Sequence, residues 1–269
     1  FVSAPGPSSY EGRGGAKLIV LTGSTTGWCH PVLFLRMRQS QQENPDRMGV
    51  VLDHRRTATC VIADQHLALS PGSDTALFNG LLCYLHEQQE TNSMFVSNCT
   101  EGLQQALDAA GATAGGVQAV AAQCGLAVDE VSRFYRLFAR TERVVTVFSQ
   151  GINQFSYGTD KVNSIINCHL LTGRIGRPGM GPFSFTGQPN AMGGREVGGL
   201  ANQLAAHMEI ANPEHRDRVQ RFWQSPVIAQ REGLKAVDLF RAIEAGQVKA
   251  VWIMATNPAV SLPDTQRVR

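Results

Sequence analysis

Short apolar runs that each end in a small polar turn recur along the chain, and a helix-like stretch follows the turn. Three such runs lie at residues 17–22, 48–52 and 66–69, and a fourth lies at 144–149. Strand, polar turn and helix in this order are typical of a parallel sheet whose strands are joined by crossover helices. The sequence therefore predicts an α/β fold: a Rossmann-like, doubly wound, mostly parallel sheet with helices on both faces.

The segments around this pattern set the expected domain limits. Residues 1–16 are expected to form a lead-in segment, 17–248 a Rossmann-like domain, and 249–269 the truncated start of an adjoining segment of a second α/β domain. That last segment opens with an apolar run at 249–254, which predicts a strand. The first residue is not Met and the chain stops soon after this strand, so we expect an internal piece of a longer protein. Further helices are expected at residues 100–141, with a break at 111–116, and at 160–171, 196–208, 214–223 and 235–245.

Charge and cysteine spacing argue against several classes of function. The net charge of +2 comes with no basic run, so nucleic acid is not expected as a partner. No apolar stretch approaches the ~20 residues that span a bilayer, so no membrane is expected either. The six cysteines form no CxxC pair, which argues against an iron–sulfur, zinc or other metal site within the chain. Isolated cysteines fit a reducing, cytoplasmic setting.

A glycine-rich loop is expected at residues 172–199, which hold nine of the 27 glycines and three of the 12 prolines. Dense glycine permits sharp turns and close approach to another backbone or to a ligand. Arginines and amides in the loop supply donors suited to an anion. A long loop without periodicity inside a compact domain is usually functional.

Polar residues follow the expected strands, where ligands bind in doubly wound sheets. Glycine, hydroxyl, amide or charged groups stand at five such ends, which together predict one extended, phosphate-bearing ligand. These groups are Gly23–Thr26, Asp53–Thr57, Gly72–Asp74, Gly151–Gln154 and Thr256–Asn257.

Taken singly, these groups leave alternatives open. The turn at residues 23–27 can present N–H groups and hydroxyls to a phosphate, or it can be a plain strand–helix turn, since it matches neither GxGxxG nor a Walker loop. Asp53 resembles the ribose-binding acid of dinucleotide folds. Arg55 and Arg56 can serve a phosphate or a base, or form a solvated surface pair. No nucleophile elbow, HxxxH pair or carboxylate pair stands out, so the chain has binding groups without an evident catalyst.

Six motifs point to a known family. Together they resemble the molybdopterin-guanine-dinucleotide oxidoreductases, and among these the catalytic subunits of bacterial assimilatory nitrate reductases. The similarity runs from about Leu18 to Asp264. TGQPNAMGGREVGG is specific to the nitrate reductase branch, whereas the other motifs are shared more widely, for example with formate dehydrogenases. The motifs are, in order, GSTTGWCHPVLF, DHRRTAT…AD, PGSDTALFNGLL, SQGINQFSYGTDKVN, LTGRIGRPGMGPFSFTGQPNAMGGREVGGLANQLAAHM and IMATNPAVSLPD.

The resemblance implies a Mo-bis(molybdopterin guanine dinucleotide) cofactor, of which this fragment, the central αβα domain of the fold, binds a part. A 4Fe-4S cluster and the molybdenum-ligating cysteine of the full-length parent would lie upstream of Phe1. Cys29 is therefore not a molybdenum ligand but a neighbour of the dinucleotide. An electron-donor protein or domain is implied for the parent, and the fragment alone is expected to be inactive.

The resemblance also implies roles for single residues. The turn from Gly23 to Cys29 would lie along one dinucleotide, and Asp74 would accept hydrogen bonds from the N–H edge of guanine. The cofactor-binding set would be Gly23, Ser24, Thr25, Thr26, Cys29, Asp53, Arg55, Arg56, Thr57, Gly72, Ser73, Asp74, Gln150, Gln154 and Asn257. Gln188 and Arg195 would line the catalytic pocket, where nitrate loses an oxygen atom and leaves as nitrite.

Three other functions are alternatives to nitrate reduction. A formate dehydrogenase of the same superfamily is disfavoured by GQPNAMGGRE at residues 187–196. A nicotinamide-dependent dehydrogenase would need a glycine fingerprint that the turn at 23–29 lacks. A non-catalytic scaffold subunit is disfavoured because Asp74, Gln188 and Arg195 are retained.

Overall fold

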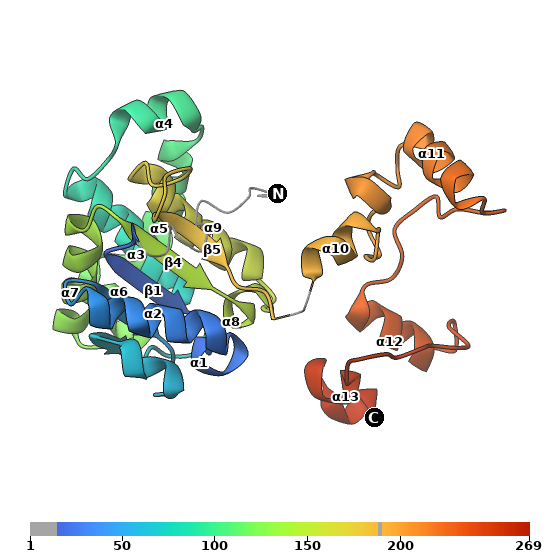
Figure 1. Cartoon of the computed structure of the whole chain (residues 1–269), viewed down its shortest axis with the longest axis horizontal. Coiled ribbons are helices and arrows are strands. Elements are labelled where there is room, and N and C mark those ends of the chain that lie inside the picture. Colours follow the sequence, from blue (N-terminus) through green and yellow to red (C-terminus); the bar gives the residue numbers. More distant parts are fainter. Residues whose placement is uncertain (1–14, 188–189) are drawn as a thin grey trace. The chain divides into compact units, whose positions relative to one another are not determined.

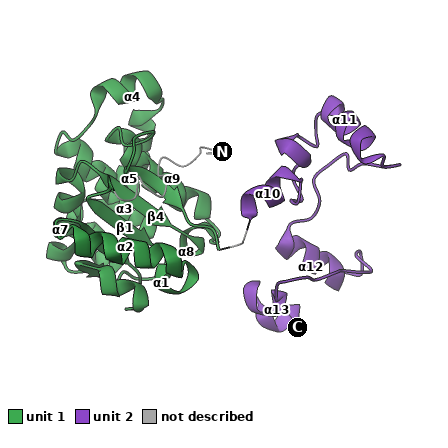
Figure 2. Cartoon of the chain, in the orientation of Figure 1, with its two compact units in different colours: residues 1–187 green, residues 188–269 purple. Residues whose placement is uncertain are grey.

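The computed structural model describes residues 15–187 and 190–269. These residues fall into two compact units, which divide between Gly187 and Gln188 (Figure 2). The domain limits expected from the sequence stay a prediction.

The first unit is built on a parallel sheet of five strands in the order β3-β2-β1-β4-β5 (Figure 1). The strands are β1 (Leu18–Thr22), β2 (Met48–Leu52), β3 (Gln65–Leu67), β4 (Val144–Phe148) and β5 (Gly181–Ser184). The chain winds outward from β1 to β3, then crosses back over β1 to β4 and β5. The switch in winding direction lies between β1 and β4, and the α/β fold expected from the sequence is confirmed.

Helices of the first unit cover both faces of the sheet (Figure 1). Because neighbouring strands run parallel, each connection between them has to cross over a face of the sheet, and these helices lie in the connections. They are α1 (Thr26–Cys29), α2 (Pro31–Glu43), the 3₁₀ helix η2 (Ala58–Ile62), α3 (Asp74–Glu87), α4 (Ser93–Cys99), α5 (Leu103–Ala114), α6 (Val117–Cys124), α7 (Val128–Arg140), α8 (Gln150–Asn153) and α9 (Gly158–Leu171).

Two apolar layers hold the sheet between these helices. Alternate residues of β1 divide between them: Leu18 and Val20 join the core that includes residues of α3, α5, α6, α7 and α9, whereas Ile19 and Leu21 join the core that includes residues of α2 and η2. This is the period-two alternation of a strand. Both layers are buried, so the strands read as continuous apolar runs rather than as alternating ones.

Two stretches of this unit differ in part from the sequence-based expectation. The helical region expected at 100–141 breaks at Gly115, within the expected break at 111–116, and a second time at Gly125, which was not expected. Both glycines adopt left-handed conformations, which end α5 and α6. The loop expected at 172–199 contains the short strand β5. Pro182 in β5 is tolerated because β5 is an edge strand of the sheet.

The second unit is helical in its described part. Its small core consists of Leu204, Ile210 and Val219, with Met208 and Ile228 packed against it. The helices are α10 (Ala191–Glu196), the 3₁₀ helix η3 (Ala205–His207), α11 (Pro213–Trp223), α12 (Ala236–Glu244), α13 (Pro258–Ser261) and α14 (Thr265–Val268).

Two expectations for the second unit are wrong. The helix expected at 196–208 does not form: α10 ends at Glu196, Gly198 adopts a positive φ of 76°, and the 3₁₀ helix η3 (Ala205–His207) is the next helical segment. The strand expected at 249–254 is absent: this run has no ladder partner in the described part of the chain, and Trp252 is 87% exposed. An apolar run becomes a strand only where a neighbouring strand satisfies its backbone N–H and C=O groups.

Candidate functional site

The candidate site lies at the carboxyl edge of the sheet, beside the switch between β1 and β4. Gly23 follows β1 and Gly151 lies at the start of α8, just after β4. Their backbones touch, with the N–H of Gly151 donating to the C=O of Gly23 at 3.0 Å. A Cβ on Gly23 would lie 2.7 Å from the backbone N of Ile152, and Gly23 has φ of 53°. Only glycine fits this approach without strain.

The turn after Gly23 satisfies much of its own polarity. The hydroxyls of Ser24 and Thr26 are buried and bond to each other at 2.8 Å. The N–H of Gly27 donates to the hydroxyl of Thr59 at 3.1 Å. The hydroxyls are therefore engaged within the fold, while Thr25 is half-buried and Cys29 is exposed at the end of the four-residue helix α1.

The residues after β2 form a tight turn around Asp53. One carboxylate oxygen of Asp53 accepts from the backbone N–H of Arg55 at 2.9 Å and lies 3.5 Å from Nδ1 of His54. The Asp53 carbonyl lies 2.9 Å from Nε2 of His66 on β3. Arg55 and Arg56 are exposed, so both guanidinium groups can reach an anion in solution.

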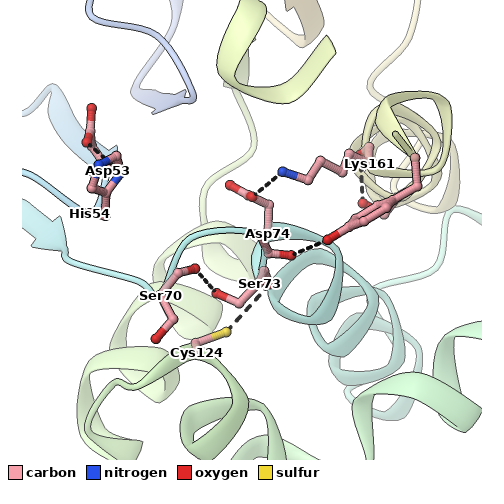
Figure 3. A network of polar contacts seen from close by, with 10 residues as sticks. Asp53, His54, Ser70, Ser73, Asp74, Cys124 and Lys161 are labelled. Atoms are coloured by element: carbon pink, nitrogen blue, oxygen red, sulfur yellow. Dashed lines mark hydrogen bonds and ion pairs between the residues drawn. The ribbon is translucent and has the colours of Figure 1, made fainter. Parts of the chain in front are cut away.

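The residues after β3 start helix α3. Gly72 has φ of 88°, and the hydroxyl of Ser73 donates to the carbonyl of Ser70 at 2.7 Å. Asp74 is the first residue of α3, where a negative charge interacts favourably with the helix dipole. Its Oδ2 forms an ion pair with Nζ of Lys161 on α9 at 2.8 Å (Figure 3).

Lys161 is the functional-site neighbour that sequence reasoning missed. It is buried, and its ammonium lies over the ring of Phe155 at 4.0 Å from the centroid. The sequence contains a pattern that could have identified it. Lys161 lies four residues before Ile165, which lies three residues before Cys168, so all three share one face of the helix at 158–171. A lysine on an apolar face indicates a buried partner of opposite charge.

The residues after β4 close this edge of the sheet. The hydroxyl of Ser149 donates to the carbonyl of Phe185, just beyond β5. Gln150 begins α8 and is half-buried, while Gln154 follows α8 and is exposed. The structure thus brings the expected residues that follow β1, β2, β3 and β4 to one edge of one sheet.

Several buried polar atoms at this edge have no hydrogen-bond partner among the residues that the structure describes. They are Oγ1 of Thr22 at the end of β1, Oγ1 of Thr57 after β2, and Oδ1 of Asn153 in α8. Nε2 of His30 is a fourth; burial lowers the pKa of His30, so this ring is neutral near pH 7. Unpaired buried polar atoms are uncommon, so these fit an edge that is completed by polar groups of a bound molecule.

The remaining expected residues belong to the second unit. Gln188 lies outside the described residues. Arg195 is exposed near the end of α10, and its carbonyl accepts from Nε2 of Gln203 at 2.7 Å. Asn257 precedes α13 and does not follow a strand. The geometry of the sheet edge therefore gives no evidence on the roles of these three residues, which stay predictions.

Arg174, a donor within the glycine-rich stretch, serves the fold. Its guanidinium is buried and donates to the carbonyls of Phe138 and Thr141 at 3.0 and 2.7 Å, at the end of α7. Burial lowers the pKa of Arg174 to about 10. The neighbouring His169 is fully buried against Thr146 of β4, and burial followed by the charge of Arg174 lowers its pKa well below 6.5.

Comparison with known proteins identifies the family. The model of the molybdopterin oxidoreductase family matches residues 11–269. The chain belongs to the molybdopterin oxidoreductase family.

Relatives of this molybdopterin oxidoreductase chain include proteins named nitrate reductase. That of Klebsiella oxytoca is 52% identical over 97% of this chain, and that of Shewanella frigidimarina is 45% identical over 97%. A periplasmic nitrate reductase of Desulfovibrio desulfuricans is 36% identical over 94% of the chain. The chain spans 29%, 28% and 35% of the length of these three proteins, respectively.

The fold also resembles a solved structure, that of acetylene hydratase from Pelobacter acetylenicus. The TM-score is 0.53 at 19% identity, over 59% of this chain and 21% of that one. This similarity supports the fold alone. In residues 15–187 and 190–269, no helix is long and apolar enough to cross a membrane.

Proposed function

We propose that this chain is part of a molybdenum enzyme that reduces nitrate to nitrite, and that the sheet edge binds the guanine dinucleotide end of a Mo-bis(molybdopterin guanine dinucleotide) cofactor. Family membership and the nitrate reductases among the relatives support the proposal. One observation carries it: the polar residues after four strands share the carboxyl edge of one parallel sheet, beside its switch point. Extended nucleotide ligands bind in this position.

The residues that would hold the dinucleotide follow from their chemistry. Asp74 offers carboxylate acceptors to the N1–H and N2–H groups of guanine, and the exposed Arg55 and Arg56 offer charge to phosphate. The absence of side chains at Gly23 and Gly151 lets the turns after β1 and β4 pack directly against each other, so the residues of both turns lie together at the sheet edge. Unpaired buried atoms of Thr57 and Asn153 supply further polar contacts.

Arg195 and Gln188 are proposed to bind the nitrate anion. A guanidinium can donate two parallel N–H groups to two oxygens of a planar anion. Both residues lie in TGQPNAMGGREVGG, which resembles the nitrate reductase branch. The bound molybdenum group would supply the electrons and accept the oxygen atom, while Arg195 orients the substrate.

The wider setting is part of the same proposal. A 4Fe-4S cluster and an electron-donor protein or domain would deliver electrons to the parent enzyme. We also propose that the parent enzyme is an assimilatory nitrate reductase and that it is located in the cytoplasm. All six cysteines are free in the structure, which is consistent with a reducing compartment.

The test is made on the purified protein at its natural length. Molybdenum content, guanosine monophosphate released by acid hydrolysis, and nitrite formed with reduced viologen are measured together. We expect molybdenum, released guanine nucleotide and nitrite production. Formate oxidation without nitrate reduction would instead support the formate dehydrogenase alternative, and loaded protein with neither activity would support a scaffold role.

The variants Asp74→Ala and Asp74→Asn test the dinucleotide site. Asp74→Ala should lower the guanine nucleotide content, because both acceptors are lost. Asp74→Asn should be milder, because its amide keeps one acceptor for two guanine donors. Unchanged molybdenum and guanine content in purified Asp74→Ala protein would contradict the assignment.

A further inference from the structure

The ion pair between Asp74 and Lys161 joins two helices at the candidate site. Asp74 comes from the first turn of α3 and Lys161 from the first turn of α9, and their side chains point toward each other (Figure 3). Nζ of Lys161 lies 2.8 Å from Oδ2 of Asp74. The Lys161 side chain is 1% exposed, whereas that of Asp74 is 13% exposed. The acid is therefore the member of the pair that still reaches the surface.

Aromatic rings enclose the ammonium of Lys161. The ring centroid of Phe155 is 4.0 Å from Nζ and that of Tyr157 is 5.7 Å away. The two rings meet edge to face at 4.7 Å, and the hydroxyl of Tyr157 donates to the carbonyl of Gly72 at 3.3 Å. Ring faces attract a cation but exclude water. Water therefore cannot readily replace the ammonium beside Asp74 if Lys161 is removed.

This arrangement engages one oxygen of the Asp74 carboxylate from within the protein. An ammonium has three N–H donors and no acceptor, so Lys161 cannot itself accept the N–H groups of a ligand. It fills one of the about four lone-pair sites of the Asp74 carboxylate and leaves the others for a ligand. With Oδ2 held, rotation of the carboxylate is restricted before any ligand arrives. Preorganised polar groups bind more tightly and more selectively than groups that must be ordered on binding.

We propose that Lys161 is a positioning residue that holds the Asp74 carboxylate against a guanine base, and so sets the preference of the site for guanine over other purines. The proposal rests on the proposed function of Asp74. Guanine offers both N1–H and an N2 amino group, hypoxanthine lacks the amino group, and adenine presents an acceptor at N1. A fixed carboxylate discriminates among these bases by the number of donors that meet it, whereas a mobile one discriminates less.

The experiment uses cofactor-free protein at its natural length and three probes: guanosine, inosine and adenosine monophosphates. Dissociation constants are measured by calorimetry for the parent, Lys161→Met, Lys161→Arg and Asp74→Asn. We expect the parent to bind the guanine nucleotide at least tenfold more tightly than the inosine nucleotide. Lys161→Met should reduce this ratio at least fivefold. Lys161→Arg, which keeps the cation, should preserve most of the ratio.

Two controls separate positioning from a general structural role. A structural defect weakens all three nucleotides equally and leaves the guanine-to-inosine ratio unchanged, which would overturn the proposal. The double variant Asp74→Asn/Lys161→Met leaves no unpaired buried charge. If Lys161 acts through Asp74, this double variant shows the same ratio as Asp74→Asn alone. A further drop in the ratio would show that Lys161 acts independently of Asp74.

If Lys161→Met does not fold, Lys161→Ala, which also removes the charge and every donor, supplies the same ratio and the same decision. A parent with no preference for guanine would contradict the proposed function of Asp74 itself. A parent that prefers guanine, combined with an unchanged ratio in folded Lys161→Met protein, would overturn only the role of Lys161.

Discussion

Replacing Gly23 by alanine tests the close contact on which the sheet edge depends. The new Cβ would lie 2.7 Å from the backbone N of Ile152 and 2.8 Å from the backbone C of Gly151, distances that real Cβ atoms do not show. These neighbours are backbone atoms, so a rotamer change cannot relieve the clash. Gly23 also has φ of 53°, which costs an alanine about 1–2 kcal/mol. Overpacking adds about 1–3 kcal/mol.

The expected loss of unfolding free energy is therefore about 2–5 kcal/mol, the sum of the strain and overpacking terms. Gly151→Ala should lose about 1–3 kcal/mol, because its Cβ meets Gly23 at 2.8 Å but its φ is not positive. Gly111 is the matched control. It lies within α5 with no heavy atom within 4 Å of its added Cβ, so Gly111→Ala should gain about 0.5–1 kcal/mol.

Urea unfolding followed by far-ultraviolet circular dichroism measures all three variants. We expect the order of stability to be Gly111→Ala, parent, Gly151→Ala and Gly23→Ala. A Gly23→Ala protein within about 0.5 kcal/mol of the parent, the range of ordinary surface changes, would refute the contact between the ends of β1 and β4.

Three further predictions concern ionisable side chains. In the protein at its natural length, Arg195→Lys should keep the molybdenum content but lower kcat/KM for nitrate about tenfold to a hundredfold, because lysine cannot donate two parallel N–H groups. This loss is equivalent to about 1.5–3 kcal/mol. Wild-type kinetics in this variant would show that Arg195 has a structural role only. His169 has a lowered pKa in the folded state, so its contribution to stability is fully present above its unfolded pKa of 6.5 and is lost as pH falls below that value. Unfolding free energies from pH 8 to 5 should show this decline, and His169→Gln should reduce it. Arg174→Met should lower the free energy of unfolding in urea by about 1.5–3 kcal/mol, because the carbonyls at the end of α7 lose a charged donor. An unchanged midpoint of urea unfolding would contradict the capping role of Arg174.

The sheet was predictable because its signal is local. Four apolar runs lie within about a residue or two of β1, β2, β3 and β4, and each ends in a turn that the sequence marks with glycine, serine or aspartate. The fifth strand was not predictable from periodicity. Residues 181–184 contain a glycine and a proline, and they become a strand only because β4 offers its free edge.

The candidate site was predictable in outline but not in its partners. Asp74 was identified by its place after a strand, and that place is a property of the sequence. Its pairing with Lys161 depends on the packing of α9 against α3, across 87 residues of chain. The arginines of the glycine-rich loop were expected as donors to an anion, yet one of them, Arg174, donates to carbonyls at the end of α7 within the fold. The apolar run at 249–254 shows the converse, because strand propensity without a neighbouring strand gives no strand.

The strand order also has a consequence for how this chain folds during synthesis. β1 pairs with β2 after a short crossover, as Leu18 opposite Met48 shows, but its other edge pairs with β4, where Leu18 lies opposite Val144. The helices from α3 to α7 are all made between these two events. One edge of the central strand thus stays open until β4 leaves the ribosome, and non-local parallel pairing is slow. In that interval an open apolar strand edge is a template for wrong partners, so chaperones that shield β1 should raise the yield of native protein.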